Sequence, residues 1–306
     1  MSLAVLFPGQ GSQVAGMGDP WAEDAAARDV LDRASSALGR DVIEACRDED
    51  LLSTTEWAQP LLLACDVAAF AALTSRGVRA EAAAGHSLGE YAALVAADVL
   101  ALDAALALVA ERGRAMQTAA DERPGTMSAL LCGTDEGARI CEEARGDGVL
   151  AVANENGPKQ VVLSGSVDAI ERAESLARDR RVRAIRLNVA GAFHSPLMAS
   201  AVSRMRTALA GVELRPPTFP VVANVSAEPV RDPEMFRDLL ARHVVSPVRW
   251  EASIRALDAS GVDRFVEAGP GDVLTKLARR IVPQTQADSA GSPGAASDLA
   301  DGIRGG

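Results

Sequence analysis

Several features that mark particular protein classes are missing from this sequence of 306 residues. Its four cysteines include no C-x-x-C pair, and we expect all of them to be reduced thiols. Cysteines and the three histidines form no cluster with the spacing of metal ligands, so we expect no metal and no bound cofactor. Aromatic residues amount to only 3%, and much of the 48% hydrophobic content is alanine. The composition is that of an ordinary globular protein with a substantial core.

Charge and hydropathy exclude further classes of partner. The formal net charge of −11 disfavours a surface for nucleic acid or for anionic membranes. No apolar run approaches membrane-spanning length, and no basic region precedes the first apolar run, as it would in a signal sequence. We therefore expect a cytoplasmic monomer with neither nucleic-acid nor membrane partners.

Strand-like and helix-like segments alternate from the start, which predicts an α/β fold with a parallel sheet. The pattern changes beyond Pro124, where the segments follow the order β-α-β-β-α-β that is typical of a ferredoxin-like unit. After Ser195 the first pattern resumes, so the small unit is an insertion in a larger one. Outside the insertion we predict strands at 3–7, 78–84, 221–224 and 264–268, and helices at about 21–38, 56–75 and from Asp103 onward. Inside it we predict strands at 127–131, 149–154, 160–165 and 182–188, and helices at 135–144 and 167–179.

These segments define the predicted domain organisation. The large unit comprises residues 1–123 and 190–286, and the small unit comprises residues 124–189. Residues 287–306 are mostly small or polar, and we expect them to be disordered.

A loop with two glycines follows the first predicted strand, in "VLFPGQGSQV". Gly9 and Gly11 fill the first two glycine positions of a dinucleotide fingerprint, but Val14 occupies the third. No acidic residue stands at the usual distance beyond, and the Gly-Lys-Ser/Thr ending of a phosphate-binding loop is absent. The glycines therefore have a role other than holding a nucleotide phosphate.

The stretch "AAAGHSLGEYAALVAA" places the pattern G-x-S-x-G between a predicted strand and a predicted helix. Gly85 and Gly89 would let the turn tighten so that the hydroxyl of Ser87 stands exposed at the helix N-terminus. Ser87 is therefore a candidate nucleophile; the alternative is a serine that only caps the helix. A nucleophilic serine needs a base to take its proton.

Three histidines compete for the role of that base. His86 neighbours Ser87, so its side chain should point to the opposite side. His243 lies on a predicted helix end in a polar stretch, where we expect a surface position. His194 lies in the loop between the small unit and the resumed large unit, at an expected domain cleft, and is the favoured base.

Two arginines on the helix from Asp103 differ in their helical neighbours. Arg114 has mostly polar neighbours three and four residues away and should be solvated, whereas Arg112 has Leu108, Val109 and Met116. A guanidinium on an apolar face is costly unless a carboxylate meets it. That carboxylate could belong to another residue of the chain or to a ligand.

The motifs "FPGQGSQ", "GHSLGEY", "ERGRAMQ", "GAFHSPLM" and "EAGPGDVL" occur in that order. In this respect the chain resembles malonyl-CoA:acyl carrier protein transacylases and the related acyltransferase domains of polyketide synthases, from Leu3 to about Val282. The resemblance implies an α/β-hydrolase-like core with a ferredoxin-like insertion. It also implies malonyl-CoA as acyl donor and a phosphopantetheinylated acyl carrier protein as acceptor.

The resemblance further implies roles for residues of the site. The backbone N–H groups of Leu88 and Gln10 would form the oxyanion hole, and Gly9 and Gly11 would let that loop come close. The main-chain carbonyl of His243, where the family usually has an amide side chain, would orient His194. Arg112 would bind the free carboxylate of the malonyl group. Gln59 would lie near the pocket, the alternative being an amide on the helix surface.

Phe193, in "GAFH", would favour malonyl over methylmalonyl by filling the space of an α-methyl group, although Gly191 departs from the usual histidine of that pattern. The implied reaction is a malonyl transfer through Ser87. The alternatives are a discrete polyketide acyltransferase with another extender unit, a hydrolase that clears acyl groups from carrier proteins, a general esterase and a non-catalytic carrier-binding module. The carboxylate-binding arginine disfavours the hydrolase, and the G-Q-G-S-Q loop disfavours an esterase.

Overall fold

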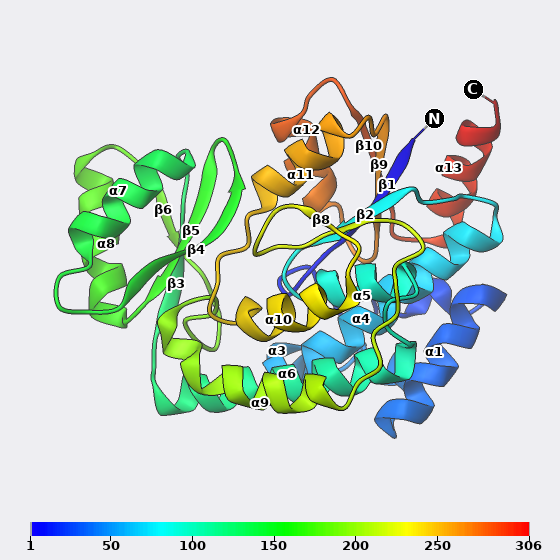
Figure 1. The fold of residues 1–306 in the computed structure, drawn as a ribbon, viewed down its shortest axis with the longest axis horizontal. Helices are drawn as coiled ribbons and strands as arrows, with labels where there is room; N and C mark the ends of the chain where they lie inside the picture. The colour runs from blue at the N-terminus through cyan, green and yellow to red at the C-terminus, as the bar shows by residue number, and fades with distance from the viewer. Residues whose placement is uncertain (1, 306) are drawn as a thin grey trace.

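The computed structural model describes residues 2–305, which form a large and a small unit, each built on its own β-sheet (Figure 1). The large sheet has six strands in the order β10-β9-β1-β2-β7-β8. Every neighbouring pair in it is parallel except β7 and β8. The predicted α/β class with a parallel sheet is confirmed. The strands are β1 (Leu3–Phe7), β2 (Ala82–Gly85), β7 (Val221–Val222), β8 (Pro229–Val230), β9 (Arg264–Ala268) and β10 (Gln286–Ala290).

Helices cover both faces of the large sheet, which explains why all five residues of β1 are buried and apolar. Leu3, Val5 and Phe7 join the larger core with helices such as α4 and α6, whereas Ala4 and Leu6 join a second core with α11 and α12. The helical elements of this unit are η1 (Asp19–Trp21), α1 (Ala25–Leu38), α2 (Val42–Ala45), α3 (Glu49–Ser53), α4 (Thr55–Ser75), α5 (Gly89–Ala96), α6 (Leu102–Glu122), η2 (Pro196–Met198), α9 (Ala199–Ala210), α10 (Pro233–His243), α11 (Trp250–Ala259), α12 (Val273–Ile281) and α13 (Pro293–Gly305).

Helix α4 corrects one expectation from the sequence. By length and composition alone, Thr55–Ser75 is apolar enough to cross a membrane, although no run of that kind was expected. In the structure 78% of its most apolar window is buried. The helix packs closely with α1 and α6 in the larger core.

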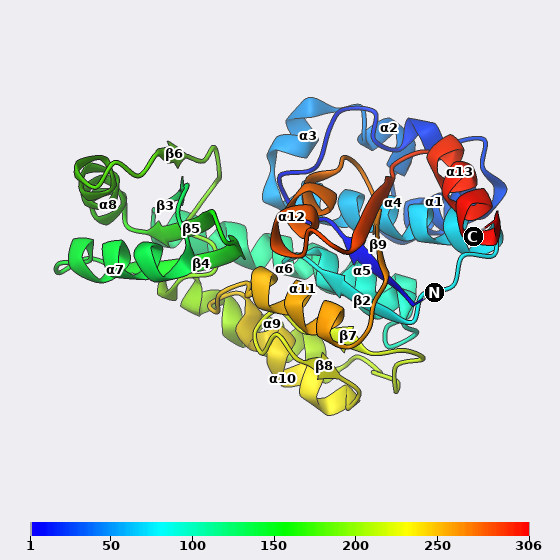
Figure 2. The same cartoon turned by 90° about the horizontal axis from the view of Figure 1, so that it is seen from above.

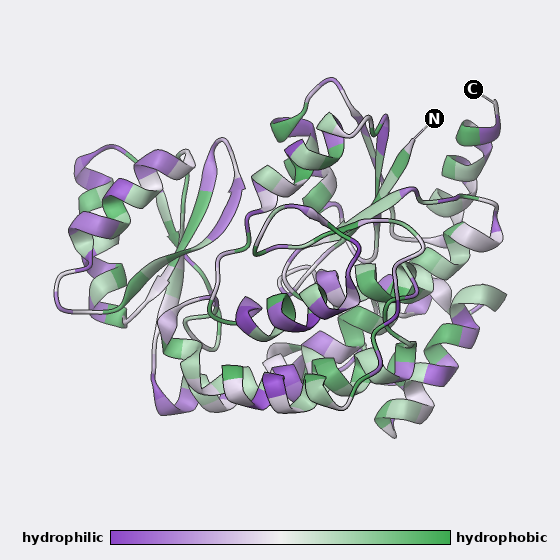
Figure 3. Ribbon diagram, viewed as in Figure 1, coloured by the Kyte–Doolittle hydropathy of each residue, from purple (hydrophilic) through white to green (hydrophobic). Residues whose placement is uncertain are grey.

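The small unit projects from one side of the large one, as the view from above also shows (Figure 2). Its sheet has the order β4-β5-β3-β6 with every pair antiparallel. Helices α7 and α8 alternate between polar and apolar residues (Figure 3) and bury their apolar side in a separate core. The elements are β3 (Thr126–Leu130), α7 (Thr134–Ala144), β4 (Leu150–Gly157), β5 (Gln160–Gly165), α8 (Val167–Asp179) and β6 (Ala184–Arg186).

The C-terminal segment is not disordered, so the expectation for residues 287–306 is wrong over the part that the structure describes. Strand β10 pairs in parallel with the whole of β9. Helix α13 packs on α4 and buries Ala296, Leu299 and Ala300. The composition misled because alanine and serine suit both a flexible tail and a closely packed helix. Pairing with an existing strand edge is a tertiary effect that composition does not contain.

We predict that deleting residues 287–306 lowers the free energy of unfolding by about 2 kcal/mol or more, because β9 loses its outer partner and the larger core loses its apolar contacts with Leu299. Urea denaturation followed by circular dichroism measures the change. Deleting only residues 304–306 is the matched control, since it leaves β10 and the buried residues of α13 in place. Equal stability of the long deletion and the full chain would contradict the prediction.

Candidate active site

Ser87 stands in a sharp turn between β2 and α5, and its backbone has a φ of 53°, which is unusual for a residue other than glycine. The flanking positions must be glycine because neither has room for a Cβ atom. A Cβ on Gly85 would overlap the backbone of Gly89, and a Cβ on Gly89 would overlap the carbonyl oxygen of Phe7 in β1. The turn therefore lies directly against the central strand, with the serine hydroxyl at the start of a helix.

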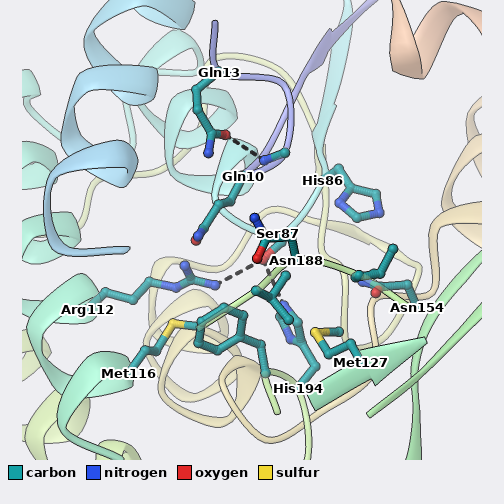
Figure 4. Close-up of a pocket in the computed structure, with 14 residues that line it drawn as sticks. Gln10, Gln13, His86, Ser87, Arg112, Met116, Met127, Asn154, Asn188 and His194 are labelled. Carbon is teal, nitrogen blue, oxygen red and sulfur yellow. Dashed lines mark hydrogen bonds between the residues drawn. The ribbon is translucent and has the colours of Figure 1, made fainter. Parts of the chain in front are cut away.

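His194 lies beside Ser87 in the structure, with 2.8 Å between His194 Nε2 and Ser87 Oγ (Figure 4). Its other ring nitrogen, Nδ1, faces two carbonyl oxygens, those of His243 at 3.0 Å and Ser246 at 3.1 Å. Because carbonyls only accept hydrogen bonds, Nδ1 carries the proton and Nε2 is free to accept one from the serine hydroxyl. The imidazole is thus oriented by main-chain groups in place of a carboxylate.

The electrostatic surroundings keep His194 neutral. Burial, and then the nearby charge of Arg112, lower its pKa to about 3, an effect that the two carbonyl hydrogen bonds oppose. A neutral imidazole can take a proton at any pH well above that value. His194 therefore has both the geometry and the protonation state of a general base.

Arg112 reaches the same point from α6 and is only 1% exposed. Its Nη1 donates to Gln59 Oε1 at 2.7 Å. Its Nη2 donates to Ser87 Oγ at 3.1 Å (Figure 4). Within residues 2–305, no Asp or Glu oxygen lies within the 4.0 Å of an ion pair with it, and its Nε has no hydrogen-bond partner. Of the two possibilities left open by the sequence, the internal ion pair is therefore not present. Arg114, by contrast, is half-exposed and pairs with Glu111 at 3.1 Å, in agreement with the solvated position expected for it.

The glycine loop after β1 packs on the serine turn. A Cβ on Gly9 would overlap the carbonyl oxygen of His86, and it would lie 3.6 Å from the backbone nitrogen of Leu88. The next residue, Gln10, lines the cavity in front of Ser87. Its side chain is within hydrogen-bond range of Gln59, with 3.3 Å between Gln59 Nε2 and Gln10 Oε1. The two backbone segments predicted to hold an oxyanion thus lie side by side.

A cavity of about 150 Å³ opens in front of the serine, and Gln10, Ser87, Arg112, Phe193 and His194 line it together with Met116 and Met127. A second cavity of about 310 Å³ shares Gln10 and His86 with the first. It continues between the small sheet, at Ala129 and Val162, and helix α12, at Leu274 and Leu277. The site therefore lies between the two units, as the position of His194 in the sequence predicted. Residues 2–305 contain no group of three or more His, Cys, Asp or Glu side chains placed to hold a metal ion.

Two residues lie deeper than expected. His243 is fully buried, not on the surface, because the last turn of α10 packs against Glu90 of α5; its ring centroid is 5.1 Å from that of His194. Gln59 is also fully buried, so the alternative of a helix-surface amide is wrong. His86 points away to Asn156, with 2.8 Å between its Nε2 and Asn156 Oδ1.

Two buried residues behind the serine were not singled out from the sequence. Asn224 follows β7 and accepts a hydrogen bond from the backbone N–H of Ser87 at 2.7 Å. Glu90, three positions after Ser87, is 1% exposed. A carboxylate in the otherwise apolar stretch "EYAALVAA" was the available signal for Glu90. For Asn224 there was none, because its contact spans 137 residues of chain.

Comparison with known proteins finds relatives that match nearly the whole length of the chain. A family model described as "Acyl transferase domain" matches residues 5–296. The chain is 38% identical over 299 residues to the malonyl CoA-acyl carrier protein transacylase of Escherichia coli K12, covering 95% of this chain and 96% of that protein. It is 40% identical over 303 residues to the polyketide biosynthesis protein ThaF of Burkholderia thailandensis, covering 96% of this chain and 25% of that protein.

Solved structures agree in fold. The acyl-carrier-protein S-malonyltransferase of Burkholderia pseudomallei superposes with a TM-score of 0.94 at 38% identity, covering 98% of this chain and 100% of that one. The corresponding enzyme from Bartonella henselae gives a TM-score of 0.95 at 37% identity, covering 99% of this chain and 100% of that one.

Proposed function

The chain belongs to the acyl transferase domain family, and from this membership and the geometry of its site we propose that it transfers a malonyl group from malonyl-CoA to the phosphopantetheine thiol of an acyl carrier protein. The observation that carries the proposal is the position of Ser87 Oγ, 2.8 Å from His194 Nε2 and 3.1 Å from Nη2 of Arg112, which forms no ion pair within residues 2–305. A nucleophile, a base and a carboxylate-binding cation thus meet at one oxygen atom.

In the first step, Ser87 Oγ attacks the thioester carbonyl of malonyl-CoA while His194 Nε2 takes the hydroxyl proton. The negative charge that develops on the carbonyl oxygen is stabilised by the backbone N–H groups of Leu88 and Gln10. A pair of such donors typically contributes several kcal/mol in the transition state. The carbon–sulfur bond then breaks, His194 returns its proton to the leaving thiolate of CoA, and a malonyl ester of Ser87 remains.

The second step repeats the first with another thiol. The phosphopantetheine thiol of the carrier protein gives its proton to His194 and attacks the ester carbonyl. The same oxyanion donors stabilise the second tetrahedral intermediate. Collapse of that intermediate breaks the ester bond and returns the proton from His194 to Ser87 Oγ, so the enzyme is regenerated without a bound cofactor.

Arg112 selects an acyl group with a free carboxylate. Leaving a guanidinium buried without a counter-charge is costly, and a malonyl carboxylate would supply that charge with bidentate geometry. Gln59 holds Nη1 at 2.7 Å and so fixes the direction of the fork. This arrangement also favours a transferase over a hydrolase that clears acyl groups from carrier proteins, because such a hydrolase does not require a carboxylate-binding cation.

The two units correspond to an α/β-hydrolase-like core and a ferredoxin-like insertion. The element order β3-α7-β4-β5-α8-β6 and the sheet order β4-β5-β3-β6 support the second assignment. Residues 124–189 form the insertion, and the core takes up residues 2–123 together with the chain from 190 through β10 and α13. The cavity between them admits malonyl-CoA and then the carrier-protein arm.

The acyl-enzyme is the first test of this function. We predict that incubation with malonyl-CoA adds one malonyl group to the wild type and none to Ser87→Ala, as measured by intact-protein mass spectrometry. His194→Ala should acylate several orders of magnitude more slowly, because nucleophile and base act as a unit. A malonyl adduct on Ser87→Ala would refute the assignment of the nucleophile.

Arg112→Ala should slow malonyl transfer by about 10²-fold or more, the rate equivalent of about 3 kcal/mol, because the substrate carboxylate loses its buried partner. Acetyl transfer from acetyl-CoA should change far less, since an acetyl group has no second carboxylate. The matched control is Arg114→Ala on the same helix, whose side chain is half-exposed. An equal loss with both donors would mean that Arg112 has a purely structural role.

Phe193 should set the preference for malonyl over methylmalonyl. Its ring lines the cavity beside His194, and the space next to Gly191 is filled by Ala120, so Gly191 does not create room for a larger group. We predict that the wild type prefers malonyl-CoA by roughly ten- to two-hundredfold in a competition read from the acyl-enzyme mass, and that Phe193→Ala narrows the ratio. Comparable labelling of the wild type by both donors would show that Phe193 is not the gate.

A further inference from the structure

The turn that carries Ser87 is held from behind by one side chain. The backbone N–H of Ser87 donates to Asn224 Oδ1 at 2.7 Å, and Asn224 Nδ2 donates to the carbonyl oxygen of Gly85 at 2.6 Å. These two groups lie at the end of β2, where the sheet no longer satisfies them. A fully buried amide thus completes the hydrogen bonding of a strained turn and fixes the direction of its nucleophile.

Asn224 is itself fixed from two sides. Its backbone N–H donates to Glu90 Oε2 at 3.2 Å, and its carbonyl oxygen accepts from the N–H of Arg249 at 3.1 Å. It follows β7, which pairs with β2 in parallel, so strand pairing already brings it level with the turn. These contacts restrict the Asn224 side chain to one conformation, in which its Oδ1 accepts from the Ser87 backbone N–H.

The same carboxyl group connects this support to the base. Glu90 Oε2 lies 3.6 Å from Nδ1 of His243, and the carbonyl oxygen of His243 is an acceptor for His194. Glu90 and the His243 ring are both at most 1% exposed. Burial raises the pKa of Glu90 to about 8, so its carboxyl group is neutral at pH 7 and does not set a bare charge beside the two histidines.

We propose that Asn224 is a positioning residue for Ser87. Together with Glu90 and His243, here named the Asn224 cluster, it holds Ser87 and His194 in a fixed position relative to each other. The proposal rests on the acyl-transfer function proposed above. None of the three side chains contacts the substrate cavity, so they act on the reaction only through Ser87 and His194. Productive attack requires Ser87 Oγ and His194 Nε2 to be aligned, and a misplacement of about 1 Å can lower the rate about 10²-fold.

The test compares Asn224→Ala with Ser253→Ala. Ser253 in α11 is also fully buried and polar, but its hydroxyl donates only to the carbonyl of Arg249, the residue before the helix, at 3.0 Å. For Asn224→Ala we expect kcat for malonyl transfer to fall about 10²-fold while KM for malonyl-CoA changes less than about threefold, because Arg112 and Gln59 are untouched. Ser253→Ala should keep the wild-type rate per folded molecule.

A second readout does not depend on the proposed substrate. Labelling of Ser87 by a fluorophosphonate probe, followed by mass spectrometry, should slow in Asn224→Ala by a factor similar to that for kcat. Should the wild type form no malonyl-enzyme, the proposed function would fail, yet the labelling rates would still test the positioning role. Equal labelling of Asn224→Ala and Ser253→Ala, or rate losses that match only the unfolded fraction, would overturn the proposal.

Glu90 provides a variant pair in case Asn224→Ala does not fold. Glu90→Gln keeps an oxygen acceptor for the Asn224 backbone N–H, and Glu90→Ala removes it. We expect Glu90→Ala to lower kcat and the labelling rate together, and Glu90→Gln to restore most of both. Equal rates in the two variants would show that Glu90 does not help to position Ser87 and His194, and would contradict the proposed role of the Asn224 cluster.

Discussion

The contact of three backbone segments without intervening side chains is the constraint on which the rest of the site depends. The loop after β1, the end of β2 and the start of α5 meet where Gly9, Gly85 and Gly89 have no room for a Cβ. This close approach forces Ser87 into a left-handed conformation and brings the loop backbone against the turn. Strain at one residue is tolerated because the parallel sheet and the buried hydrogen bonds behind the turn outweigh it.

The second constraint is electrostatic. The site contains a buried cation, Arg112, a neutral base, His194, and a buried carboxyl group, Glu90, that is kept neutral by its surroundings. A built-in carboxylate beside Arg112 would stabilise the free protein but would repel a substrate carboxylate and compete for the same guanidinium. Within residues 2–305 Arg112 has no such partner, and in the proposed function this leaves its guanidinium available to a substrate carboxylate. In the free protein its hydrogen-bond partners are Gln59 Oε1 at 2.7 Å and Ser87 Oγ at 3.1 Å.

Most elements of the fold could be predicted from local sequence patterns. The bounds of β5, α8 and β9 agree with those predicted. Helix α8 has a clear helical period, and the two strands are short runs that end at or just before a glycine. Ser87 was predictable from a motif of five residues, and the apolar surroundings of Arg112 from its helical neighbours. The C-terminal strand and helix were not, since they form only by adding to β9 and α4. Neither the burial of His243 nor the hydrogen bond between Asn224 and Ser87 could be predicted locally, because each depends on contacts between distant parts of the chain.

The lowered basicity of His194 has a consequence for the timing of catalysis. Its pKa is held down by burial and, after that, by the positive charge of Arg112. A substrate carboxylate that binds Arg112 cancels this charge, so His194 becomes a stronger base when an acyl group with the right second functional group is in place. Water or an acyl group without a carboxylate meets the weaker base. In the proposed function, Arg112 would thereby couple the binding of a substrate carboxylate to the activation of Ser87 by His194.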